Sequence, residues 1–117
     1  MPPLILIVDD EFVLRSVLAD IFADAGYRVL SAGDGREALA MAERDPPDVV
    51  LSDVMMPILD GVSLVRHLRE RGVGSAVVLM SAGYAKVDLP GVRFLRKPFD
   101  LDHILETVQR SLDGKMA

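Results

Sequence analysis

"VVLSDVMMPILDG", residues 49–61, begins as an apolar run and then reaches a carboxylate, Asp53, before two methionines and a proline. A short, continuous apolar run is typical of a strand that is buried on both faces of a sheet. Asp53 therefore stands where such a strand ends. Taken alone, this residue could cap a helix, form a turn or be a solvated loop residue, so the rest of the chain has to decide among these.

Strand-like and helix-like segments alternate along the chain. The run "LILIV" predicts a first strand, and apolar residues at helical spacing then predict a helix that ends before Gly26, where a C-terminal cap belongs. Asp60 and Asp100 are placed to cap two later helices. The alternation predicts an α/β fold, with helices on both faces of a parallel sheet. The expected strands are 4–8, 27–32, 49–52, 76–80 and 93–95, and the expected helices are 12–25, 35–45, 61–71 and 101–112.

The composition limits the classes of protein to which the chain can belong. A length of 117 residues, of which 50% are hydrophobic and 26% charged, fits one globular domain. The net charge of −5 disfavours nucleic-acid binding, which needs a basic face. There is no cysteine for disulfide or thiolate chemistry, and the isolated His67 and His103 suggest no zinc site. The N-terminus resembles neither a signal peptide nor a membrane span.

Polar residues follow four of the five expected strands. Asp9 and Asp10 follow the first strand, Asp53 the third, Ser81 the fourth and Lys97 the fifth. Because the carboxyl ends of parallel strands lie at one edge of a sheet, where such sheets bind ligands, we expect these side chains to meet. A helix cap would explain one acid but not this set.

Three carboxylates at close range repel one another, so a cation is needed to relieve them. Mg²⁺ is the natural candidate, because it takes a few carboxylates and keeps several waters. It would also attract a phosphoryl group, whose oxygens Lys97 and the Ser81 hydroxyl could bind. Asp53 would then be the nucleophile that forms an acyl phosphate.

Four motifs carry a family resemblance: "IVDDE" (7–11), "LSDVMMPILDG" (51–61), "VVLMSAG" (77–83) and "RFLRKPF" (93–99). In this order and spacing they resemble the receiver domains of response regulators in two-component signalling, of the chemotaxis-regulator kind. The resemblance extends over about residues 4–112. It implies a single receiver domain over residues 1–117 and a flavodoxin-like, doubly wound sheet of five parallel strands in the order 2-1-3-4-5.

The resemblance also implies which residues hold the metal ion and the phosphoryl group. Asp53 would be the phosphoacceptor and a Mg²⁺ ligand, Asp10 a direct ligand, and Asp9 a ligand mainly through water. The backbone carbonyl of Met55 would complete the protein ligands, while the side chains of Met55 and Met56 are predicted to pack in the loop. Lys97 would contact the phosphoryl group.

Ser81 and Phe94 match the hydroxyl and the aromatic residue of the family's switch. For Phe94, a plain core residue is the competing interpretation. The bond between Lys97 and Pro98 is usually cis in the family, as proline permits. Phosphorylation would draw the Ser81 hydroxyl inward, and Phe94 would follow.

The partners implied by the resemblance are a sensor histidine kinase or a histidine phosphotransfer protein, and an unknown downstream protein. No direct contact with nucleic acid or membrane is expected, and the expected location is cytoplasmic. The chain would be a signalling receiver rather than an enzyme with a separate substrate, promoting its own phosphorylation and slow dephosphorylation.

Three other functions compete with this one. A phosphatase with an aspartate nucleophile would need a second acid two residues after Asp53, where this chain has Met55. Nucleotide-binding glycine-rich motifs are also missing from the sequence. The remaining alternative is a receiver-like protein-interaction module that is never phosphorylated.

One region departs from the family pattern. Only "AGYAKVDLPGV" (82–92) separates Ser81 from the fifth expected strand, which is several residues short of the usual length. A crossover between parallel strands usually needs a dozen or more residues, so the family's fourth helix should be short or absent. The sequence ends soon after the last expected helix, as in a stand-alone regulator or a receiver cut from a larger kinase, and Met1 favours the first.

Overall fold

Five parallel strands form one sheet, in the order β2-β1-β3-β4-β5, in a computed structural model that describes residues 1–83 and 89–116. The strands are β1 (Leu4–Val8), β2 (Arg28–Ala32), β3 (Val49–Asp53), β4 (Ala76–Ser81) and β5 (Val92–Arg96). The helices are α1 (Phe12–Asp24), α2 (Gly35–Arg44), α3 (Gly61–Glu70) and α4 (Leu101–Met116). The predicted fold class and strand order are confirmed, and the predicted bounds agree to within a few residues.

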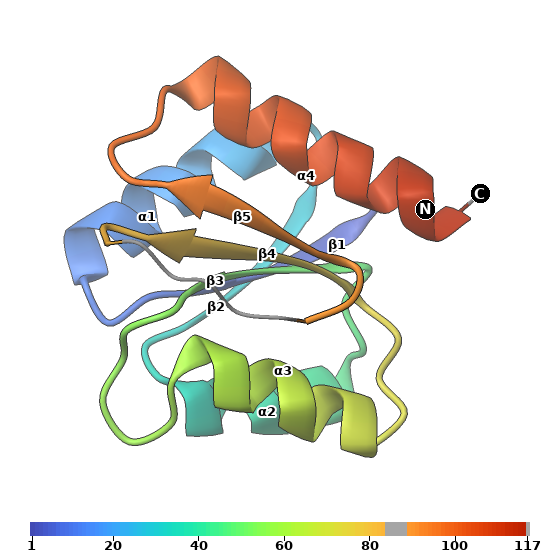
Figure 1. Cartoon of the computed structure of the whole chain (residues 1–117). Helices are drawn as coiled ribbons and strands as arrows, with labels where there is room; N and C mark the ends of the chain where they lie inside the picture. The colour runs from blue at the N-terminus through green and yellow to red at the C-terminus, as the bar shows by residue number, and fades with distance from the viewer. Residues whose placement is uncertain (84–88, 117) are drawn as a thin grey trace.

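The helices form two layers, one on each face of the sheet. Figure 1 shows α1 and α4 above the sheet and α2 and α3 below it, with the carboxyl ends of β4 and β5 pointing to the same side. Every residue of β1 and β3, the strands that Asp9 follows and Asp53 ends, is buried. This two-sided burial explains why both strands are continuous apolar runs in the sequence.

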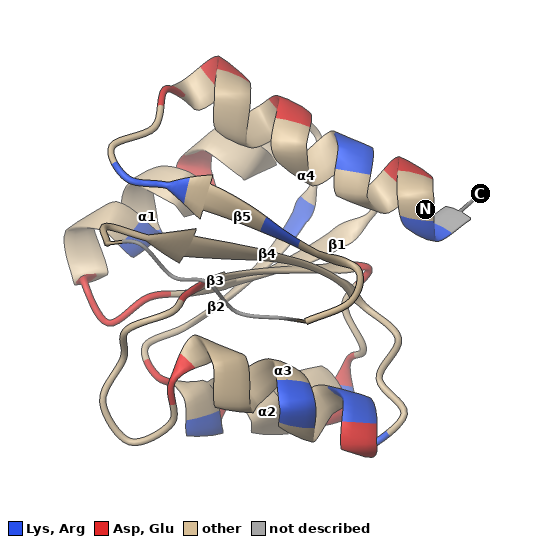
Figure 2. Ribbon diagram, in the orientation of Figure 1, with Lys and Arg blue, Asp and Glu red and all other residues tan. Residues whose placement is uncertain are grey.

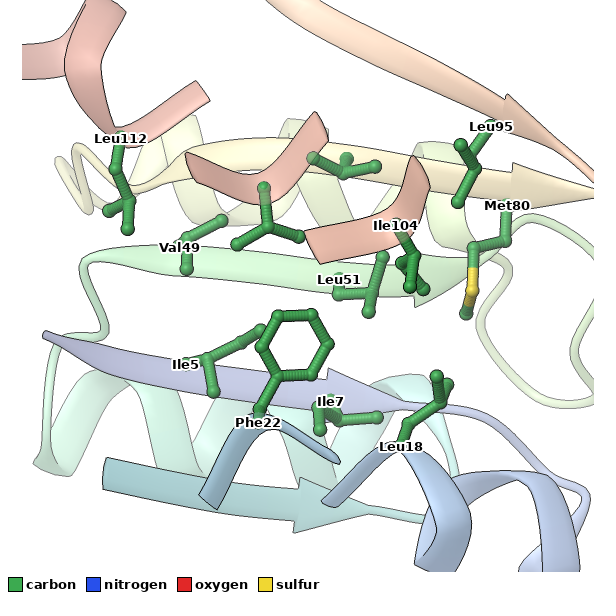
Figure 3. Packing of buried hydrophobic residues seen from close by; sticks show 12 residues of the cluster. Ile5, Ile7, Leu18, Phe22, Val49, Leu51, Met80, Leu95, Ile104 and Leu112 are labelled. Carbon is green, nitrogen blue, oxygen red and sulfur yellow. The ribbon is translucent and has the colours of Figure 1, made fainter. Parts of the chain in front are cut away.

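Alternate residues of β1 pack in two different hydrophobic cores, one on each face of the sheet. Ile5 and Ile7 pack with Phe22 of α1 and Ile104 of α4, and Figure 3 shows these side chains gathered between the sheet and the two helices. The intervening Leu6 and Val8 belong to the second core, with residues of α2 and α3. Successive side chains of a strand point to opposite faces of the sheet, so β1 packs against a helix layer on each face.

Local signals fix the helix ends as predicted. Asp60 Oδ1 accepts from Ser63 N at 2.8 Å at the start of α3, and Asp100 Oδ1 accepts from His103 N at 2.7 Å at the start of α4. Gly26, which follows the C-cap residue Ala25 of α1, has a φ of +95°, a conformation that favours glycine. None of the helices in the described part of the chain combines the length and the apolar character that crossing a membrane requires.

The connection between β4 and β5 is short. Its described residues, 82–83 and 89–91, contain bends and a turn but no helix. The sequence predicts that the family's fourth helix is short or absent here, and residues 84–88, where it would fall, lie outside the described residues. Leu89 packs with Val62 of α3 against a small core that includes Val65 and Leu79, and Arg69 of α3 donates a hydrogen bond to the carbonyl of Pro90. The connection is thus fastened directly onto α3.

Gly61 should tolerate no side chain, because α3 begins against the backbone of β3. A methyl group built on Gly61 overlaps the carbonyl oxygen of Asp53 and lies 3.1 Å from Val54 Cα. We expect Gly61→Ala to lower the free energy of unfolding by about 1–3 kcal/mol, measured by urea denaturation, although alanine is the better helix former. Gly74→Ala is the control, because no atom lies within 4 Å of the added methyl. Equal stability of the two variants would contradict the close approach.

Candidate functional site

The register of the sheet brings the polar strand ends together. Val8 of β1 lies opposite Ser52 of β3, so the residues that follow them, Asp9 and Asp53, are neighbours. On its other side, Asp53 is paired with Met80 of β4. Because this pairing continues through Asp53, the phosphoacceptor candidate is the last residue of β3 rather than a loop residue or a helix cap.

Three carboxylates meet at this edge of the sheet. Asp9, Asp10 and Asp53 each offer one oxygen, and these oxygens lie within 4.8 Å of one another. Asp9 is fully buried, Asp53 is 9% exposed and Asp10 is open to solvent. Figure 2 shows acidic ribbon in the loop after β1 and basic ribbon after β5, on the same side of the sheet. The structure therefore brings together the three predicted acids, whose individual roles stay predictions.

Lys97 supplies the positive charge. Its Nζ lies 3.3 Å from Asp53 Oδ2 and 3.5 Å from Asp9 Oδ2. Its N–H donates to Ser81 O at 2.8 Å, and its peptide bond to Pro98 is cis, as the resemblance implies. Burial lowers the pKa of Lys97, but the charges of Asp9 and Asp53 and the hydrogen bonds to them outweigh burial. The pKa is therefore raised above its ordinary value of 10.5, and the ammonium stays charged.

Asp9 is fully buried, and its pKa is shifted. Burial raises the pKa of Asp9 above its ordinary value of 3.8, and the charge of Asp53 raises it further. The Glu11 N–H, which donates to Asp9 Oδ1 at 2.9 Å, and the Lys97 ammonium both lower this pKa without cancelling the effect of burial. Without a metal ion, the fold therefore resists the ionisation of Asp9.

Ser81 is the last residue of β4 and is 8% exposed. Its Oγ donates to Gly83 O at 3.0 Å and accepts from Gly83 N at 3.2 Å. The hydroxyl is thus engaged with the first residues of the β4–β5 connection, although Lys97 N–H holds the carbonyl of the same residue.

The structure corrects two interpretations of side chains. The prediction of loop packing is right for Met56, which packs against the second core, but wrong for Met55, whose side chain is 75% exposed. A role for the Met55 backbone carbonyl does not depend on this side chain. Phe94 is not a core residue, because it is 39% exposed on the edge strand β5, whereas its neighbour Leu95 is buried.

Arg15 lies next to the acid cluster, and Gly33 lies beside Arg15. The sequence analysis did not predict a role for either residue. Arg15 Nη1 donates to the carbonyl oxygen of Asp9 at 2.7 Å. The guanidinium group lies beside Gly33, where a built methyl group would be 3.1 Å from Nη1. The available signal was a lone cation in "FVLRSVLA", the otherwise uncharged first eight residues of α1.

The cluster fits Mg²⁺ by the chemistry of its donors. Its three members are carboxylates, the hard oxygen ligands that Mg²⁺ prefers. Mg²⁺ also retains several waters, and the solvent-open side of Asp10 leaves room for them. A divalent ion would relieve the repulsion among the acids, which the single ammonium of Lys97 compensates only in part.

Comparisons with known proteins agree with the geometry. The model of the response regulator receiver domain matches residues 5–109. The chain belongs to this family, the receiver domains of two-component response regulators. The resemblance drawn from the four motifs is therefore confirmed.

Relatives align with nearly the whole chain. Regulatory protein AtoC of Escherichia coli is 41% identical over 92% of this chain, and sporulation initiation phosphotransferase F of Bacillus subtilis is 32% identical over 95%. Response regulator MprA of Mycolicibacterium vanbaalenii is 38% identical over 96%. The chain spans 25% of the length of AtoC and 51% of MprA, but 94% of phosphotransferase F.

Solved structures share the fold. Chemotaxis protein CheY4 of Vibrio cholerae superimposes with a TM-score of 0.88 at 31% identity, covering 95% of this chain and 99% of that one. The receiver domain of the hybrid histidine kinase CckA gives a TM-score of 0.82 at 39% identity, covering 93% and 98%. The same fold thus serves in a chemotaxis protein and within a hybrid kinase.

Asp9→Asn tests the raised pKa in metal-free protein. Because the pKa of Asp9 is higher in the folded state than the unfolded value of 3.8, the folded state binds more protons just above pH 3.8, and stability falls as the pH rises through this window. Asp9→Asn has no carboxyl group at this position, so it does not lose stability in this way as the pH rises. We therefore expect its unfolding free energy, minus that of wild type, to rise with pH from about 4 and then level off.

Urea denaturation in the presence of a chelator, repeated across this pH range, measures the difference. Val17→Ala is a suitable control, because Val17 lies exposed on α1 and does not titrate. A flat profile for Asp9→Asn would show that Asp9 ionises normally in the folded protein.

Proposed function

We propose that the chain is a phosphoacceptor receiver in a two-component phosphorelay. It takes a phosphoryl group onto Asp53 from a phosphohistidine of a sensor histidine kinase or a histidine phosphotransfer protein, and then switches a protein-interaction surface. The observation that carries this proposal is one ammonium, Lys97 Nζ, within 3.5 Å of two carboxylates, with a third carboxylate completing the cluster. Such a site favours the joint binding of a divalent cation and a phosphoryl group, because each compensates the charge of the other.

In the transfer step, a carboxylate oxygen of Asp53 forms the new P–O bond while the P–N bond to the donor imidazole breaks. Lys97 Nζ, already 3.3 Å from Asp53 Oδ2, is placed to neutralise a phosphoryl oxygen. The Ser81 hydroxyl donates to a second oxygen. As the family resemblance implies, the receiver also promotes its own slow dephosphorylation.

Mg²⁺ would be held by the acid cluster. Asp10, Asp53 and the backbone carbonyl of Met55 would bind it directly, and Asp9 would bind it through water. When present, the ion supplies positive charge against the phosphoryl oxygens. Asp10 suits direct coordination because it faces solvent, from which a hydrated ion arrives.

Ser81 and Phe94 are the proposed switch residues. To reach a phosphoryl group on Asp53, the Ser81 hydroxyl has to leave Gly83, with which it makes two hydrogen bonds. Phe94 lies on the edge strand and is already 39% exposed, so it can change position without opening a core. The surface that changes is then the β4–β5 connection with β5, where a downstream protein would bind.

The proposed setting is a cytoplasmic relay without direct contact to nucleic acid or membrane. A relay role is supported by the name of the phosphotransferase from Bacillus subtilis, of which this chain spans 94%. The alternative is a receiver-like module that is never phosphorylated. The site does not favour this alternative, because the three acids, the Ser81 hydroxyl and Lys97 are all present at one edge of the sheet.

Phosphorylation at Asp53 is the first test. With acetyl phosphate and Mg²⁺, we expect intact mass spectrometry to show one added phosphoryl group on wild type and none on Asp53→Asn, because the amide is not a nucleophile. Asp60→Asn is the matched control: Asp60 is an acid that follows the same strand, and asparagine preserves its capping of α3. Phosphate gain by Asp53→Asn at the wild-type level would refute the assignment.

Metal binding is the second test. At a Mg²⁺ concentration one hundred times its dissociation constant, we expect wild type to gain about 2.7 kcal/mol of stability by mass action, seen as a higher melting temperature. Asp10→Asn should lose this gain, and by removing one repelling charge it should match or exceed wild type in stability without metal. Glu11→Gln, a change at the adjacent exposed acid outside the cluster, should keep the gain. A melting curve of wild type that Mg²⁺ does not move would argue for a module without phosphoryl chemistry.

A further inference from the structure

The carbonyl of Asp9 is held by a side chain of α1. Arg15 Nη1 donates to Asp9 O at 2.7 Å in a partly buried hydrogen bond. The Asp9 N–H donates to Ala32 O at 3.2 Å, and Asp9 Oδ1 accepts from Glu11 N at 2.9 Å. Asp9 is thus held at its N–H, its carboxylate and its carbonyl, and Arg15 supplies the hydrogen bond to the carbonyl.

This carbonyl belongs to the peptide unit that joins Asp9 to Asp10. A peptide unit is planar, so a fixed carbonyl oxygen also fixes the position of the next Cα, that of Asp10. The Glu11 N–H, which donates to Asp9 Oδ1, holds the peptide unit on the other side of Asp10. The two units together set the direction in which the Asp10 side chain leaves the backbone. Asp10 is exposed, so packing does not hold its side chain. The orientation of the Asp10 carboxylate toward the cluster therefore depends on the peptide unit that Arg15 holds.

Gly33 leaves the space in which the guanidinium group lies. The three atoms nearest to a methyl group built on Gly33 all belong to Arg15: Nη1 at 3.1 Å, Cζ at 3.6 Å and Nη2 at 3.8 Å. The φ angle of Gly33 lies outside the left-handed region, so the backbone itself does not require glycine here. Arg15 Cζ also lies 5.5 Å from the centroid of the Phe12 ring, a cation–π contact that helps to hold the group.

We propose that Arg15 is a positioning residue for the metal site: it holds the Asp9–Asp10 peptide unit so that the Asp10 carboxylate points into the acid cluster. Gly33 serves this arrangement by leaving room for the guanidinium group. The inference rests on the proposed Mg²⁺ site. Arg15 acts through Asp10 and contacts neither the ion nor the phosphoryl group.

The sign of the effect separates positioning from simple electrostatics. A positive charge near a divalent cation repels it, so loss of the Arg15 charge alone would make Mg²⁺ bind more tightly. Loss of positioning makes Mg²⁺ bind more weakly. Weaker binding after removal of a cation therefore cannot come from the missing charge.

The test is the Mg²⁺ affinity of the unphosphorylated chain, measured by isothermal titration calorimetry on variants whose folding is verified by circular dichroism. Arg15→Met keeps an unbranched side chain but has no donor, and we expect it to weaken binding about tenfold, as is typical when a residue that orients a ligand is lost. Arg15→Lys should lose less, because its ammonium can still donate to the carbonyl. In metal-free protein, the amide resonance of Asp10 should also shift in Arg15→Met.

Arg28→Met is the matched control. Arg28 Nε donates to Pro2 O at 3.0 Å, so it also joins an arginine to a backbone carbonyl, but near the start of β1, away from the acid cluster. We expect Arg28→Met to keep the wild-type affinity for Mg²⁺ even where it lowers stability. An equal loss of affinity in both variants would mean that general destabilisation, and not positioning, explains the result.

Gly33→Ala gives an independent test if Arg15→Met fails to fold. Its methyl group should displace the guanidinium and weaken Mg²⁺ binding in an otherwise wild-type chain. Where Arg15→Met does fold, Gly33→Ala should cause no further loss of affinity in that background. Wild-type or tighter affinity in Arg15→Met, or in Gly33→Ala where Arg15→Met does not fold, would overturn the inference but leave the metal site standing. Failure of wild type itself to bind Mg²⁺ would overturn the proposed site and the inference together.

Discussion

The ammonium of Lys97 between two buried carboxylates is the interaction on which the site depends. Asp9 directly follows β1 and Asp53 ends the neighbouring strand β3, and without a cation their charges would oppose folding at this edge. Lys97 follows β5, which is separated from β3 by β4, so its side chain has to reach across the end of an intervening strand. The hydrogen bond from Lys97 N–H to Ser81 O fixes the backbone position from which this side chain extends. The contact of Lys97 Nζ with Asp9 and Asp53 therefore depends on the strand order, on the register of the strands and on the hydrogen bond from Lys97 N–H to Ser81 O.

The site combines a rigid nucleophile with a more open metal ligand. Asp53 is paired to β4, and its carbonyl lies so close to Gly61 that α3 begins with no room for a side chain. Asp10, by contrast, faces solvent. This division suits the proposed chemistry, because the attacking oxygen needs a fixed position while the metal ligand has to exchange bound water for the ion.

The strands and the convergence of acids could be predicted from the sequence because both follow from local pattern. The run at 4–8 matches β1 residue for residue, since two-sided burial makes every position apolar. Other features depend on tertiary contacts. The three-residue pattern "RFL" could not tell which residues of an edge strand face outward, so the exposure of Phe94 was not predictable. Arg15 became significant only once the fold placed Gly33, from the loop after β2, beside it.

The short β4–β5 connection changes which element can respond to the site. At one end, the Ser81 hydroxyl is bonded only to Gly83 within the described residues, so a turn of this hydroxyl toward Asp53 must break both bonds to the connection. At the other end, Leu89 packs against α3 and Arg69 holds Pro90. No described residue between these ends is helical. Among the described elements, α3 and β5 are therefore the ones that the far end of the connection contacts, and a disturbance that enters at Gly83 can pass to them.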